Sequence, residues 1–211
     1  MNRWMKKLSY LLTAILCISS FALQVSAYSA DSALLTRKMN QVLEPGKLTY
    51  ANLYDIDKVE SADLQAFARE MTRRSGKVFL NFTTLDVKQQ SAARIIVNPN
   101  LVKSAATTYN FRVLNNTEAA EAAREKFERF WRKDVAVIHC LQDDFGMSVV
   151  LSAKLDLTGI DTKNMAAYTY NPDKNSYKLI ENATCTLDDK GFVHLQTTAG
   201  GLILITTAPA K

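Results

Sequence analysis

The chain has 211 residues, of which 47% are hydrophobic and 22% charged, and its formal net charge is +5. This length and composition suit one large globular domain or two small packed lobes and exclude a low-complexity chain. The expected leader holds three basic residues and no acidic one, so its removal lowers the net charge to +2 and leaves no strong case for binding nucleic acid or an anionic membrane.

The N-terminus predicts a secretory signal peptide over residues 1–27. A basic start precedes an apolar run over 8–23, and small residues follow at 25–27. The run is shorter than the roughly 20 apolar residues of a membrane-spanning helix, which favours cleavage over an uncleaved anchor. Residues 206–211 carry no apolar tail or wall-sorting pattern. We therefore expect a secreted, extracellular protein, either released or held non-covalently at the cell surface, with no membrane contact after cleavage.

Helical patterns are followed by strand patterns between the leader and residue 116. Residues 28–58 form an N-terminal segment with a short helix over 31–43, and residues 59–116 form an α+β lobe. In this lobe Ser61 is the expected N-cap of a helix that ends before Gly76. Three stretches rich in β-branched and aromatic residues then predict strands: 78–85, 93–97 and 108–114.

Residues 117–134 predict a connecting helix. Thr117 is its expected N-cap, and acidic residues follow in the first turn. Three aromatic residues are expected on one face of this helix: Phe127, Phe130 and Trp131. The basic residues at its end complement the helix dipole as a solvated face: Arg129, Arg132 and Lys133.

Residues 135–211 predict an antiparallel β lobe. Seven short strands are expected: 135–142, 148–157, 165–170, 177–181, 183–187, 192–197 and 202–206. Polar turn residues separate them at 171–175 and 188–191. Alternation along 148–157 predicts one buried and one wet face. The fold class is therefore α+β and β-rich, an antiparallel β-sandwich or rolled sheet with one or two packing helices.

The chain has too few histidines and cysteines to build many kinds of catalytic site. His139 adjoins Cys140, but neighbours in a strand point to opposite faces, which argues against a Cys-His nucleophile pair. The remaining combination is a thiolate of Cys140 or Cys185 served by His194. Cys140 and Cys185 could also form a disulfide in an oxidising compartment, or stay as two buried thiols; sequence leaves both open.

No metal or cofactor site is predicted. The two cysteines and two histidines lack the spacing of a zinc site, and Asp143-Asp144 and Asp188-Asp189 match no calcium-loop pattern. No pair of carboxylates is singled out for glycoside hydrolysis, and the nucleophile-elbow, phosphate-loop and dinucleotide-binding motifs are absent from the sequence.

Aromatic residues are the best candidates for a binding surface. Tyr168 and Tyr170 share one face of a predicted strand, and Tyr177 follows the tight turn after it. Binding sheets present tyrosine to proteins or carbohydrates, and core packing is the alternative role of such residues.

Several segments resemble a family of small exported proteins of Gram-positive gut bacteria. The segments are 134–138, 145–147, 153–157, 168–171, 175–177, 189–195 and 200–206, with a fainter likeness over 94–99. The C-terminal part of this likeness is similar to the strand-turn-strand segment that ends modules in larger clostridial surface proteins. The resemblance spans roughly 78–207 and implies a secreted β-rich protein without an assigned reaction or active-site residues.

The sequence therefore predicts a secreted, non-enzymatic binding protein with a protein or carbohydrate partner at the cell surface or in the medium. One alternative is an extracellular hydrolase acting on wall or dietary polymer, which requires a pocket where two carboxylates, or His194 and a thiol, meet. The other is a structural subunit of an envelope assembly, which requires an exposed strand edge.

Overall fold

The structure is a computed structural model that describes residues 35–38, 40–41, 44–54, 56, 58–85, 91–102, 108–114, 116–181 and 183–209. The signal peptide expected over 1–27 lies outside these residues. Of the short helix expected over 31–43, residues 35–38 and 40–41 are described and are helical. Within the ranges given, no helix is both long and apolar enough to cross a membrane.

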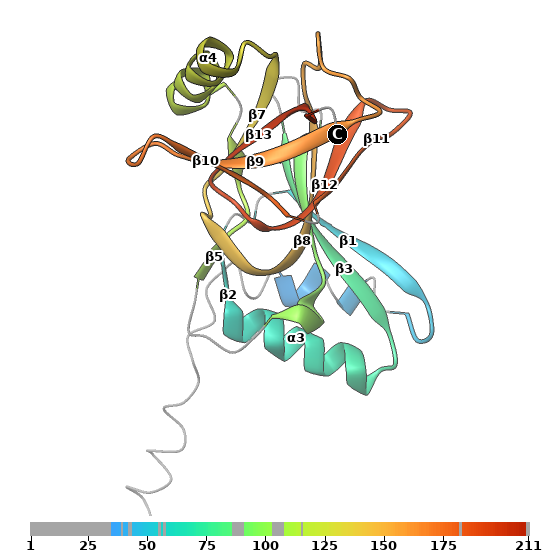
Figure 1. The fold of residues 1–211 in the computed structure, drawn as a ribbon. Helices are drawn as coiled ribbons and strands as arrows, with labels where there is room; N and C mark the ends of the chain where they lie inside the picture. Colours follow the sequence, from blue (N-terminus) through green and yellow to red (C-terminus); the bar gives the residue numbers. More distant parts are fainter. Residues whose placement is uncertain are drawn as a thin grey trace, which may run out of the picture.

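The elements follow the order β1 (Leu48–Leu53), β2 (Lys58–Glu60), α3 (Ser61–Arg73), β3 (Lys77–Leu85), β4 (Ser91–Val97), the 3-10 turn η1 (Pro99–Leu101), β5 (Thr108–Asn110), β6 (Val113–Leu114), α4 (Glu118–Trp131), β7 (Val135–Cys140), β8 (Asp144–Lys154), β9 (Met165–Asn171), β10 (Ser176–Leu179), β11 (Thr184–Leu187), β12 (Phe192–Ala199) and β13 (Leu202–Thr207). A six-stranded sheet has the order β1-β3-β4-β8-β12-β11, a five-stranded sheet has the order β10-β9-β13-β7-β6, and β2 pairs with β5. The predicted class, α+β and β-rich with packed sheets, is confirmed (Figure 1).

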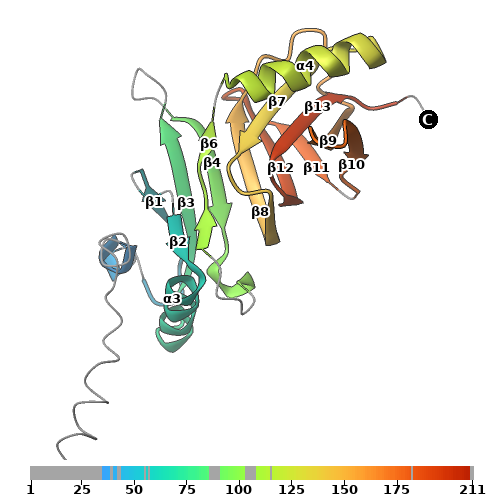
Figure 2. The same ribbon diagram turned by 90° about the vertical axis from the view of Figure 1, so that its left-hand side faces the viewer.

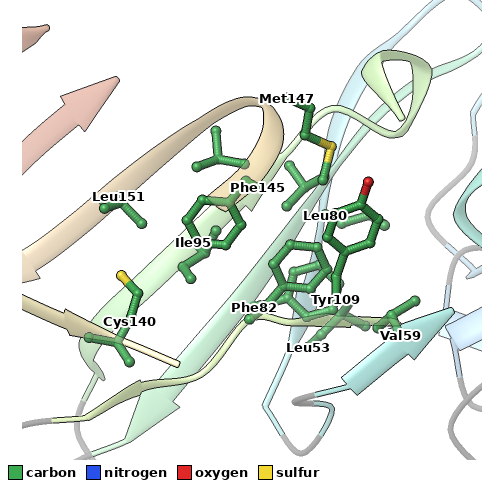
Figure 3. Packing of buried hydrophobic residues seen from close by; sticks show 14 of the residues in the cluster. Leu53, Val59, Leu80, Phe82, Ile95, Tyr109, Cys140, Phe145, Met147 and Leu151 are labelled. Atoms are coloured by element: carbon green, nitrogen blue, oxygen red, sulfur yellow. The ribbon is translucent and has the colours of Figure 1, made fainter. Parts of the chain in front are cut away.

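The core lies between the two larger sheets. Leu151 of β8 pairs with Ile95 of β4 and Leu195 of β12, and this row of side chains is fully buried. Ile138 and Ile203 of the five-stranded sheet belong to the same apolar cluster. Aromatic rings fill one end of the core, where Figure 3 labels Phe82, Tyr109 and Phe145. Apolar side chains on one face of each large sheet thus pack against the other sheet.

The chain passes between the sheets twice at one corner. β7 leads into β8 there, and β12 leads into β13. The two crossings are hydrogen-bonded to each other, from Gly200 N to Asp143 O and from Gly201 N to Gln142 O, each at 2.8 Å. A Cβ atom at Gly200 would lie 1.9 Å from Gln142 O, so the close approach of the two backbones requires glycine at this position.

α3 packs its apolar stripe into the main core at the opposite end of the molecule from α4 (Figure 1). Ser61 is its first helical residue and not its N-cap, which is Glu60 without a side-chain hydrogen bond. The helix ends through Ser75, whose φ is +53°, with bonds from Ser75 N to Thr72 O and from Gly76 N to Met71 O. Serine therefore takes the left-handed position that the sequence had suggested for Gly76.

Long-range pairing departs from the expected division of the chain. The single strand expected over 108–114 is instead two short strands in different sheets, with buried Phe111 between them. β1 was not expected and pairs in parallel with β3. β4, from the expected α+β lobe, pairs with β8 from the expected β lobe, so strands of both segments share one sheet.

Candidate functional site

α4 covers the face of the five-stranded sheet that points away from the main core (Figure 2). Its N-cap is confirmed as Thr117, whose Oγ1 accepts a hydrogen bond from Ala120 N at 3.1 Å. Ala120, Ala123 and Phe127 form its buried stripe. The two alanines let the helix lie close to β7 and β13, and Phe127 fixes its far half on β9 and β10.

The three predicted tyrosines come together beneath this helix. Tyr170 and Tyr177 are directly paired across β9 and β10, and their rings stack at 4.8 Å between centroids. The ring of Phe127 lies 5.5 Å from Tyr177 and 6.3 Å from Tyr168. Tyr170 is only 6% exposed, so its ring belongs to the packing of helix on sheet, and Tyr168 and Tyr177 are half-buried.

Two large aromatic side chains of α4 remain in solvent. Phe130 is 75% exposed and Trp131 is 48% exposed. The expected shared face holds for Trp131, whose ring stacks on that of buried Phe127 at 6.0 Å between centroids, and Phe130 contacts Trp131 at 5.4 Å. β10 is the edge strand of the five-stranded sheet, and Phe127 already contacts it. The last turn of α4 therefore has no further strand of this sheet beneath it.

A partly open cavity of about 340 Å³ lies beside Phe130, whose ring also contacts that of Trp131. We call it the helix pocket; it is lined by Lys126, Arg129, Phe130, Asn175 and Tyr177. Spacings of three and four residues place Lys126, Arg129 and Phe130 on adjoining turns of the helix. Asn175 is placed opposite by the turn after β9, where it takes a left-handed conformation with φ of +45°.

A short hydrogen-bond chain orders the polar wall of the helix pocket. Lys126 Nζ donates to the Tyr170 hydroxyl at 3.2 Å, and that hydroxyl donates to Asn175 Oδ1 at 3.0 Å. Burial, and to a smaller extent Tyr170, raises the pKa of Tyr177, so its hydroxyl stays protonated at neutral pH. Buried Tyr170 thus positions the groups that face the pocket without facing it itself.

Arg129 has no ion pair among the residues that the structure describes. Arg124, earlier on the same helix, differs in this respect. Arg124 binds Glu121 at 2.6 Å and Glu128 at 3.8 Å. The predicted role of Arg129 in complementing the helix dipole agrees with its place in the last turn. Its guanidinium also remains available at the rim of the helix pocket.

Both cysteines are free thiols on different sheets. Burial raises the pKa of Cys140 to about 12 and that of Cys185 to about 11. Each thiol therefore stays protonated at neutral pH and is a poor nucleophile. The Cys185 thiol lies 4.0 Å from Met165 Sδ, within apolar packing.

His194 belongs to a serine, histidine and aspartate set that does not form a catalytic triad. Its Nε2 lies 3.0 Å from Asp188 Oδ2, and it pairs across the strands with Ser152. Ser152 is 1% exposed, and its hydroxyl accepts a hydrogen bond from Arg94 Nε at 3.1 Å. Backbone N–H bonds, chiefly from Phe192, and His194 lower the pKa of Asp188, as expected of a carboxylate that closes a hairpin turn.

A larger cavity of about 620 Å³ lies between the other side of α4 and β7. Four carboxylates line it: Glu121, Glu128, Asp134 and Asp156. The first two are paired with Arg124, and hydrogen bonds from Thr158 lower the pKa of Asp156. The lowered pKa of Asp156 favours its ionised form, which makes it a poor general acid. In the described part of the chain, no group of three or more metal-ligating side chains could hold an ion.

The fold and the helix pocket define a β-rich α+β protein with two packed sheets and an aromatic-basic site on one helix. Comparison of the chain with models of protein families, with curated proteins and with solved structures finds no match. The likeness to exported proteins of Gram-positive bacteria therefore stays a prediction from the sequence.

Proposed function

We propose that this is a secreted, non-enzymatic binding protein whose contact surface is the helix pocket and the exposed end of α4. The observation that carries the proposal is the exposure of Phe130 and Trp131 beside a cavity. Full burial of a phenylalanine side chain contributes roughly 1.5–3 kcal/mol, and Phe130 forgoes most of this, a loss that a bound partner recovers. Aromatic residues and arginine are also the types most enriched at binding hot spots.

The pocket is preformed, which suits binding. Phe127 anchors the helix, and Tyr170 holds Lys126 and Asn175 in place. Residues held in this way lose little conformational freedom when a partner arrives. The predicted partner remains a protein or a carbohydrate at the cell surface or in the medium, and secretion remains the predicted location.

The hydrolase alternative gains no support from the residues that such an enzyme would need. The thiols are neutral, the hydroxyl of Ser152 is engaged by Arg94, and three of the four carboxylates of the larger cavity are paired with Arg124 or held in their ionised form. The binding proposal needs none of these groups.

A retention assay tests the proposal. The full chain is expressed in an exporting host, purified from the medium, and applied to isolated cell walls, defined polysaccharides and the host's secreted proteins. Saturable retention by one of these baits should fall strongly in Phe130→Ala/Trp131→Ala. Leu48→Ala/Tyr50→Ala, which removes two equally exposed apolar side chains from β1, is the matched control and should bind as the wild type does.

The two possible failures of this assay have different meanings. No retention on any bait would refute a binding function. Equal loss in both double variants would show non-specific adhesion and would remove the helix pocket as the contact surface.

A further inference from the structure

We infer that the helix pocket takes a pyranose sugar ring that carries a carboxylate group. This inference rests on the proposed function, because it names the ligand class of the same site. It follows from the donors, the charges and the ring surfaces that line the pocket.

The nitrogen-bearing side chains of the pocket offer mostly hydrogen-bond donors. An ammonium group has no acceptor, so the Tyr170 hydroxyl accepts from Lys126 and sends its own proton to Asn175 Oδ1. One of the two acceptor positions of the Asn175 amide oxygen is thereby used, and its NH₂ group is left to donate. The guanidinium of Arg129 adds further donors. A matching ligand must be rich in acceptors.

The charge of the lining is positive. Lys126 and Arg129 line the pocket, no acidic residue does, and Arg129 is without an ion pair in the described chain. A planar guanidinium suits the two oxygens of a carboxylate, which it can bind through two parallel hydrogen bonds. An anionic ligand therefore complements this site, whereas a neutral one leaves the positive charge unmatched.

Two aromatic rings supply the remaining walls. Phe130 and Tyr177 present apolar surface to the cavity, and the faces of a pyranose ring carry C–H groups that pack on such surfaces. The volume of about 340 Å³ is at the small end of ligand sites, which run from roughly 300 to 1,000 Å³. A peptide of glutamate would match the charges but has no ring to pack on the aromatic surfaces.

The test measures binding of three probes to the full chain by calorimetry. The probes are a galacturonate tetramer, a neutral galactose tetramer of the same linkage, and a glutamate tetramer of the same charge. We expect the galacturonate tetramer to bind at least about tenfold more tightly than either comparison probe. Raising the salt concentration should weaken its binding, because the contact is partly electrostatic.

Variants assign the effect to the pocket. Arg129→Gln and Phe130→Ala should each weaken galacturonate binding by about tenfold, whereas Arg124→Gln, on the same helix but paired with acidic residues, should change it by less than about twofold. Asn175→Gly keeps the left-handed turn and removes the amide donors, so it should weaken binding; it also removes the acceptor of the Tyr170 hydroxyl, so its thermal midpoint is measured alongside.

The outcomes separate this inference from the proposed function. Equal binding of the galactose or glutamate tetramer, or an equal effect of Arg124→Gln and Arg129→Gln, overturns the sugar-acid assignment. Failure of all three probes, for protein that is still retained by a bait through Phe130, also overturns it while the binding function stands. Loss of both kinds of binding refutes the proposed function itself.

Discussion

Alanine at Gly200 would break the corner that joins the two sheets. Its Cβ would lie 1.9 Å from the carbonyl oxygen of Gln142 and 3.1 Å from Cε2 of Phe145. The neighbouring carbonyl cannot turn away freely, because it accepts the hydrogen bond from Gly201 N. The two backbones must therefore separate, and both hydrogen bonds across the corner are strained or lost.

The magnitude follows from those contacts. Two backbone hydrogen bonds contribute about 1 kcal/mol each, and forcing an extra carbon into a packed site costs about 1–3 kcal/mol. We expect Gly200→Ala to lower the free energy of unfolding by about 3–5 kcal/mol. That is a large part of the roughly 5–15 kcal/mol that stabilises a typical domain.

Urea unfolding measured by circular dichroism compares the free energy of unfolding of Gly200→Ala with that of the wild type, and Gly146→Ala is the control. Gly146 has φ of +61° but no atom within 4 Å of its Cβ position, so alanine there adds only backbone strain, about 1–2 kcal/mol. If Gly200→Ala is no less stable than Gly146→Ala, the corner tolerates a side chain and the proposed collision is wrong.

Three further predictions concern the helices and one histidine. Ser75→Gly should raise the free energy of unfolding by about 0.5–1 kcal/mol, measured as a higher urea midpoint at unchanged slope, because glycine suits the left-handed end of α3 better than serine. Phe127→Ala should cost about 3–5 kcal/mol and Phe130→Ala less than about 0.5 kcal/mol in the same assay, since only the first ring is buried; the reverse order would refute the seating of α4. Burial lowers the pKa of His139 more than Asp143 raises it, so the folded protein binds fewer protons there than the unfolded chain. Stability from this residue is therefore present above about pH 6.5 and is lost as pH falls below it, and His139→Gln should flatten this part of the pH dependence.

Elements with strong local signals were predictable from the sequence. α4 carries its own N-cap at Thr117 and acidic residues in its first turn, and these depend on neighbours within the same segment. Alternation along β8 correctly buries Val149, Leu151 and Ala153. Ser152, expected on the wet face, is buried as well, because its hydroxyl is engaged by Arg94 on the next strand.

Long-range pairing was not predictable in the same way. β1 lacks clean alternation, and its parallel partner β3 lies on the far side of α3 in the sequence. Residues 59–116 and 135–211 were expected to form separate lobes, whereas β4 of the first segment pairs with β8 of the second across the whole of α4. No local pattern encodes either choice, since both depend on which apolar faces meet in the folded chain.

The candidate site also combines features that local sequence signals predict with features that depend on long-range packing. The turn after β9 signals a hairpin, so the pairing of Tyr170 with Tyr177 could follow from sequence. The exposure of Phe130 could not, because it depends on how far α4 reaches across the sheet. Phe127 and Phe130 both fit the apolar pattern of the helix in the sequence. Their burial differs because the sheet ends at the edge strand β10.

The corner and the helix pocket are parts of one scaffold. β13 begins directly after Gly201 and pairs with both β7 and β9, so the corner sets the position of the strands on which α4 rests. β9 carries Tyr170, which in turn orders Lys126 and Asn175. A change that loosens the corner should therefore weaken ligand binding as well as folding, whereas a change at Phe130 should affect binding alone.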